Sequence, residues 1–165
     1  MDLKRFLRHT FRPPWLIRRS FPGTVLDAIE KAVGEAERNH RGEIRLAVED
    51  SLPPHALWVG QTPRERAIEV FSMLRVWDTE LNTGVLVYLL LADRNVEVVA
   101  DRGINARVSA GEWERVCALM EAAYREGRFE QGSLEGIRAI AELLIRHFPR
   151  PEVNPNELPN RPVVL

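Results

Sequence analysis

The run of residues 85–92 limits the folds open to this chain more than any other segment. Its sequence, VLVYLLLA, is apolar at every position, so both faces of a strand formed here would be apolar. Such a strand must be covered on both sides, whereas a strand that alternates apolar and polar residues can leave one face to water. We therefore expect a central buried strand with helices packed on each face of its sheet.

Two neighbouring segments supply partners for this strand. Residues 93–95 (Asp-Arg-Asn) have the composition of a tight turn, and residues 96–100 are again apolar, which predicts an antiparallel hairpin. Residues 43–49 alternate Ile44, Leu46 and Val48 with other side chains and predict another strand. A helix separates this strand from residues 85–92, so the two strands should be parallel.

Helix signals fill the intervening segments. Thr62 and Glu65 form a capping box around Pro63, and Ser109 with Glu112 forms another. Apolar residues then recur at spacings of three and four. The expected helices span residues 24–39, 62–77, 109–127 and 133–148, with Ser133 as a cap. The order of elements predicts an α/β fold, a three-layer α/β/α sandwich with a small mixed sheet.

The charge is unevenly distributed along the 165 residues. The formal net charge is −1, yet residues 1–20 carry +5 and the remainder −6. The near-neutral total gives no general attraction to polyanions, so no nucleic-acid partner is expected. We divide the chain into a basic, aromatic lead segment (residues 1–23), one domain (24–149) and a proline-rich tail (150–165).

The lead segment does not have the pattern of a secretory signal. Arg8, His9 and Arg12 interrupt its apolar residues, and no run in the chain reaches the roughly 20 apolar residues of a membrane-spanning helix. We expect a cytoplasmic protein without a transmembrane span. Its large apolar and basic residues predict that the lead segment packs on the domain or on a partner, with a location at the periphery of the inner membrane as one outcome.

Standard catalytic and cofactor motifs are absent. The sequence has no glycine-rich phosphate loop, no Gly-x-Gly-x-x-Gly and no His-Glu-x-x-His. A single cysteine, Cys117, excludes an internal disulfide and a multi-cysteine metal site, and its helical position predicts a core residue.

Carboxylates gather at the two ends of the predicted hairpin. About seven residues at about 3.3 Å each separate Asp93 from Asp101 by about 20 Å, so the two cannot share one ion. One edge of the sheet carries Glu49, Asp50, Asp93 and Arg94, and the other Glu43, Asn82, Asp101, Arg102 and Gly103. Each edge could bind a phosphate or a hard cation, and each could equally be ordinary turn and strand-end chemistry.

Several segments share their order and spacing with a known family. They are residues 40–44 (HRGEI), 77–79 (WDT), 82–86 (NTGVL), 92–94 (ADR), 99–104 (VADRGI), 127–129 (GRF) and 147–149 (HFP), with Trp113. Over residues 24–149 the chain resembles the TPM-domain family of thylakoid-lumen phosphatase-like and bacterial proteins. The basic start and the tail sequence NELP (156–159) resemble a short bacterial branch without a signal peptide.

The resemblance implies a three-layer sandwich, weak acid phosphatase activity, calcium binding in some relatives and roles in assembling membrane complexes. Asp93 and Arg94 match the family's hairpin acid and arginine. Ala92 stands where relatives often carry a further acid, and residues 105–109 lack the acid common there. We therefore expect no cofactor, with calcium or magnesium as the alternative, and leave the metal ligands unknown.

Two functions remain open, and with them whether the chain is an enzyme. The first is a non-catalytic module that binds a protein partner, membrane-associated or not, through residues 1–20. The second is a weak acid phosphatase that hydrolyses phosphomonoesters with the help of a cation. Its candidate catalytic residues are Asp101, Arg102, Glu43 and Asn82, and the alternative ligand edge is Asp93, Arg94 and Asp50.

Overall fold

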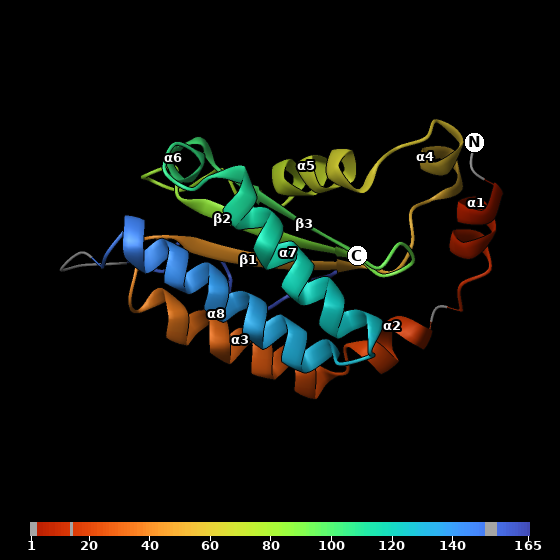
Figure 1. The fold of residues 1–165 in the computed structure, drawn as a ribbon, viewed down its shortest axis with the longest axis horizontal. Coiled ribbons are helices and arrows are strands. Elements are labelled where there is room, and N and C mark those ends of the chain that lie inside the picture. The colour runs from red at the N-terminus through yellow and green to blue at the C-terminus, as the bar shows by residue number, and fades with distance from the viewer. Residues whose placement is uncertain (1–2, 14, 151–154) are drawn as a thin grey trace.

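A four-stranded sheet lies between two layers of helices (Figure 1). The structure is a computed structural model that describes residues 3–13, 15–150 and 155–165. The strand order is β3-β2-β1-β4. The strands are β1 (Glu43–Glu49), β2 (Gly84–Leu90), β3 (Asn95–Ala100) and β4 (Val163–Val164). β1 and β2 are parallel and β2 and β3 antiparallel, which confirms both predicted pairings and the mixed α/β fold.

The alternation of side chains along the strands divides the interior into two cores. Ile44, Val87 and Val98 point to one face, which is covered by α3 (Gly23–Glu37), α7 (Ala110–Arg125) and α8 (Phe129–His147). Leu86 and Tyr88 point to the other face, toward α4 (Pro54–Trp58) and α5 (Pro63–Met73). Every residue of β2 is buried, as a central strand covered on both sides requires.

Two helix boundaries differ from the prediction. α5 ends at Met73 rather than near residue 77, because Arg75 adopts a left-handed backbone with φ of 53°. α8 begins at Phe129, so Ser133 is not a cap but a fully buried helical residue. Its hydroxyl meets the Tyr124 hydroxyl at 2.8 Å and donates to the Phe129 carbonyl. Gly132 and Gly136 let α7 approach so closely that a Cβ at either position would collide with it.

The lead segment forms two short helices, α1 (Leu3–Thr10) and α2 (Trp15–Ser20). Ile17 and Phe21 belong to the core beneath α3, α7 and α8, whereas Phe6 packs against the core on the α5 side. The lead segment therefore crosses one end of the sheet, from one face to the other (Figure 1). The predicted packing on the domain is present in this structure.

Part of the tail also joins the sheet. β4 pairs in parallel with β1, with Val163 opposite Ala47 and Val164 opposite Val48. Leu158 is buried, and the Arg45 guanidinium donates to the carbonyls of Pro159 and Arg161. No helix in the described ranges is both long and apolar enough to span a membrane.

Gly84→Ala is expected to destabilise the fold strongly. A Cβ at Gly84 would lie 1.9 Å from the backbone oxygen of Val76, so one of the two segments must move. We expect a loss of about 3 kcal/mol in the free energy of unfolding measured with urea. Gly111→Ala is the control, because a Cβ there meets nothing closer than 3.8 Å, and its stability should be unchanged or slightly higher. Equal stability of the two variants would contradict this packing.

Candidate functional site

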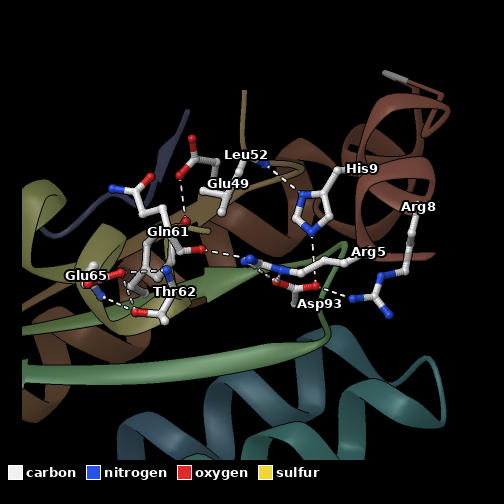
Figure 2. Close-up of polar contacts among 10 residues, drawn as sticks. Arg5, Arg8, His9, Glu49, Leu52, Gln61, Thr62, Glu65 and Asp93 are labelled. Carbon is white, nitrogen blue, oxygen red and sulfur yellow. Dashed lines mark hydrogen bonds and ion pairs between the residues drawn. The ribbon is translucent and has the colours of Figure 1, made fainter. Parts of the chain in front are cut away.

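The hairpin between β2 and β3 places Asp93 at the end of the sheet that the lead segment crosses. Three side chains from α1 surround its carboxylate (Figure 2). Arg5 contacts Oδ2 through Nε and Nη2, each at 2.9 Å, and His9 Nε2 lies 3.0 Å from Oδ1. Arg8 also donates to Oδ1. We call these four residues, Asp93, Arg5, Arg8 and His9, the Asp93 clamp.

His9 extends the clamp to a third segment. Its ring is fully buried, and Nδ1 accepts a hydrogen bond of 3.0 Å from the backbone N–H of Leu52 (Figure 2). Because an N–H points at Nδ1, the ring proton must lie on Nε2, where it is donated to Asp93. Arg5 also donates to the carbonyl of Gln61 at 2.8 Å. The clamp thus joins α1, the hairpin turn and the segment that follows β1.

The clamp keeps Asp93 ionised. Burial alone would raise the pKa of this carboxyl group, but the hydrogen bonds from His9 and Arg5 outweigh burial and hold the pKa far below its usual range. The carboxylate side chain is only 9% exposed. Asp93 is therefore a buried anion whose charge is balanced by the lead segment.

The other carboxylates of this edge are paired as well. Asp50 accepts from the guanidinium of Arg12. Glu49 accepts two hydrogen bonds from Arg66, at 2.9 and 3.0 Å, and one of 2.6 Å from the Tyr88 hydroxyl. Burial, followed by the contact with Glu49, raises the pKa of Tyr88 well above its usual range. At this edge the carboxylates of Glu49, Asp50 and Asp93 are thus all paired with basic side chains, which come from α5 and from the lead segment.

A metal ion does not fit these contacts. Calcium requires about six to eight oxygen ligands, and magnesium a near-octahedral oxygen shell. Asp93 and Asp50 instead face guanidinium and imidazole nitrogens. Within the ranges that the structure describes, no cluster of three or more His, Cys, Asp and Glu residues is arranged to hold a metal.

The structure brings Asp50, Asp93 and Arg94 to the same end of the sheet, and Arg94 occupies the left-handed turn position with φ of 51°. Reasoning from the sequence missed the cationic partners Arg5, Arg8, His9 and Arg12. Their signal was the charge of the lead segment, which is opposite in sign to the carboxylates of this edge.

At the opposite end of the sheet, Asp101 and Asn82 lie close to one another. Asp101 caps the short helix α6 (Arg102–Asn105) by accepting from the Arg102 N–H at 2.7 Å. Its other oxygen, Oδ2, is buried and has no hydrogen-bond partner in the part of the chain that the structure describes. Gly103 packs on the Asn82 carbonyl, which a Cβ would approach to 2.5 Å. The Arg102 residue is exposed.

Glu43 begins β1 at this end, but its carboxylate holds the tail. It accepts from the backbone N–H groups of Glu157 and Leu158, at 3.2 and 3.0 Å. Glu37 lies nearby and accepts from the Ile44 N–H at 2.8 Å. Burial raises the pKa of Glu37 to about 8 and also raises that of Glu43. A catalytic role for Glu43, Asn82, Asp101 and Arg102 stays a prediction.

Comparison with known proteins now adds to this geometry. The profile of a family described as the TPM domain matches residues 21–143. The solved NMR structure of BA42 from the psychrophilic bacterium Bizionia argentinensis is similar, with 30% sequence identity and a TM-score of 0.76. The match covers 86% of this chain and 93% of BA42. No curated protein matches.

Asp93→Asn is expected to loosen the lead segment. The substitution leaves Arg5 and Arg8 without their anion, and breaking a buried pair costs about 3 kcal/mol. Urea unfolding should show this loss, and the Leu52 amide should exchange with solvent faster. Glu126→Gln, which removes an ion pair whose carboxylate is 65% exposed, is the control and should cost less than about 1 kcal/mol. A similar cost for both variants would contradict a structural role for the clamp.

Glu37→Gln is expected to flatten the dependence of stability on pH. The pKa of Glu37 is raised from 4.5 to about 8 in the folded state, so the folded chain binds more protons than the unfolded chain between these values. Stability must therefore fall as pH rises through this window, by at most about 1.4 kcal/mol per pH unit for this group. Chemical denaturation at pH 5, about 6.5 and about 8 measures the slope.

Glu35→Gln, on the same helix and 58% exposed, is the matched control and should leave the slope unchanged. An unchanged slope in Glu37→Gln would show that Glu37 does not titrate in this window.

Proposed function

The chain belongs to the TPM domain family, and we propose that this member is a non-catalytic binding module that attaches to an anionic membrane surface through its lead segment. The observation that carries the proposal is an apolar stripe on the outward side of that segment. Leu3, Leu7 and Phe11 follow one another at intervals of four residues and are 61%, 46% and 76% exposed. Trp15 at the start of α2 is 57% exposed.

The stripe is outward because the Asp93 clamp fixes the opposite side of α1. His9 is buried and Phe6 packs against the core, so the remaining apolar side chains of α1 cannot turn inward. α1 packs against α4, whose last residue Trp58 is 71% exposed and is followed by Val59, which is 78% exposed. α1 and α4 lie together at one end of the molecule (Figure 1), and the exposed apolar residues of both helices therefore belong to that end.

The charge around this stripe suits an anionic lipid surface. Lys4 and Arg18 are basic and exposed, whereas Arg8 is exposed but pairs with Asp93. Helices that lie in a membrane interface combine an apolar face with Lys and Arg, and each basic residue near an anionic surface contributes about 1 kcal/mol. Tryptophan and phenylalanine side chains are well suited to the boundary between lipid and water.

The absence of a free nucleophile at the hairpin edge supports a non-catalytic role. The carboxylates Glu49, Asp50 and Asp93 are all engaged by basic side chains in the described structure. No group among these three carboxylates is left to act as a base or to coordinate a cation. Binding rather than turnover is the function that this arrangement supports best.

Vesicle flotation tests the attachment. The full chain should float with vesicles that contain phosphatidylglycerol and bind phosphatidylcholine vesicles more weakly, because of its basic residues. Phe11→Ser with Trp15→Ser should weaken binding about tenfold or more, since two exposed aromatic side chains no longer enter the lipid. Leu119→Ser with Ile145→Ser removes exposed apolar side chains elsewhere and should bind as the unmodified chain does.

Equal binding by both double variants, or no binding by the unmodified chain, would overturn the proposal. Recovery of the chain on a membrane protein in the absence of lipid would identify a protein as the partner instead.

Weak phosphatase activity is the second candidate, and one observation favours it. The Asp101 Oδ2 atom is buried without a hydrogen-bond partner in the described structure, beside the exposed Arg102. An arginine can hold a phosphate, and a carboxylate can act on a proton. The purified chain would then hydrolyse p-nitrophenyl phosphate, and Asp101→Asn would abolish turnover. Background turnover with calcium, magnesium and manganese each present excludes this activity.

A further inference from the structure

A second feature of the lead segment is a hollow lined by arginines. A cavity of about 480 Å³ lies between α2, the hairpin turn and the loop that joins α7 to α8. Four arginines line it: Arg12, Arg19, Arg94 and Arg125. Among the described residues that line it, none is acidic. For a chain of net charge −1, this is a strong local concentration of positive charge.

Two of the four arginines are not neutralised. Arg12 is paired with Asp50, and Arg125 lies 2.9 Å from Glu121. The side chains of Arg19 and Arg94 make no ion pair or hydrogen bond with any residue in the described ranges. They come from different elements, α2 and the hairpin turn, and both elements line the same cavity. The lining of the cavity therefore includes two arginines without an ion-pair partner among the described residues.

A second hollow continues from the first. Its volume is about 560 Å³, and it shares Arg19, Ser20, Gly127 and Phe129 with the arginine cavity. Its lining combines the apolar residues Pro22, Val25 and Leu134 with charged residues, namely Arg128, Arg138, Glu130 and Glu135. The two hollows together form a groove with an arginine-lined end and an end whose lining is partly apolar and partly charged.

We propose that this groove binds the phosphate of an anionic phospholipid at Arg19 and Arg94, with the start of the acyl chains against Pro22, Val25 and Leu134. Guanidinium groups pair with phosphate oxygens through two parallel hydrogen bonds, and no acidic residue among the described lining of the arginine cavity competes for them. The inference deepens the proposed function and rests on it, because attachment of the lead segment brings lipid to the groove. It adds recognition of one head group to a general affinity for the surface.

The test uses lipid in solution, without a membrane. Dihexanoyl phosphatidylglycerol, below its micelle concentration, is titrated into the ¹⁵N-labelled full chain and amide shifts are followed. We expect saturable shifts at Ser20, Asn95 and Gly127, and binding about tenfold weaker for dihexanoyl phosphatidylcholine, whose choline cation opposes the arginines. Glycerol phosphate and inorganic phosphate should bind more weakly than the lipid, because they lack the apolar part.

Arg19→Gln with Arg94→Gln should weaken binding of the phosphatidylglycerol about tenfold or more. Arg38→Gln with Arg115→Gln is the matched control, since both residues are exposed and lie outside the groove, and it should bind normally. Equal effects of the two double variants, or no saturable shift, would overturn the proposal. Glycerol phosphate that binds as tightly as the lipid would assign the site to a soluble phosphate and overturn the lipid assignment.

The two proposals can fail separately. Phe11→Ser with Trp15→Ser should weaken vesicle binding about tenfold or more yet leave the titration with soluble lipid unchanged, because neither residue lines the groove. If the unmodified chain binds soluble lipid saturably but does not bind vesicles, the proposal of membrane attachment is wrong and the proposal of a lipid-binding groove stands.

Discussion

The ion pairs at Asp93 determine how the lead segment is arranged around the domain. A buried carboxylate is costly unless it is paired, and here its partners come from a helix 84 to 88 residues away in the sequence. Once Arg5, Arg8 and His9 engage Asp93, one side of α1 is fixed and its apolar stripe must face outward. α2 is anchored separately, by Ile17 in the core, and it lines the arginine cavity together with the hairpin turn. The outward position of the apolar stripe therefore depends on one buried anion.

Local patterns predicted the elements that local interactions stabilise. The apolar segment at residues 85–92, the hairpin and the Thr62 capping box are all present in the structure. The helices α1 and α2 were not predicted, because helices this short are not stable by propensity alone and depend on tertiary contacts. β4 was also missed, since its two residues pair with β1 across more than a hundred positions of sequence. Ser133 is a residue type that often caps helices, but α8 begins four residues earlier, at Phe129, and α7 packs closely on Gly132 within it.

In the candidate site too, local patterns predicted some features, and tertiary contacts determine the others. Strand order and register were enough to place Asp50 and Asp93 at one end of the sheet and Asn82 and Asp101 at the other. They could not show which side chains engage these acids, because the partners lie at the termini of the chain. Residues from the lead segment bind Asp50 and Asp93, and the tail binds Glu43. The two terminal segments, rather than a ligand, are the partners that the structure gives to these acids.

The state of the His9 ring tests the clamp most directly, because the structure specifies which nitrogen carries the proton. Long-range ¹H–¹⁵N correlation spectra of the labelled full chain distinguish the two ring nitrogens. The account predicts a single neutral form with the proton on Nε2, facing Asp93, and a bare Nδ1 that accepts from the Leu52 amide. Averaged shifts typical of a mobile, exposed imidazole would show that α1 does not occupy the hairpin edge, and would contradict the account.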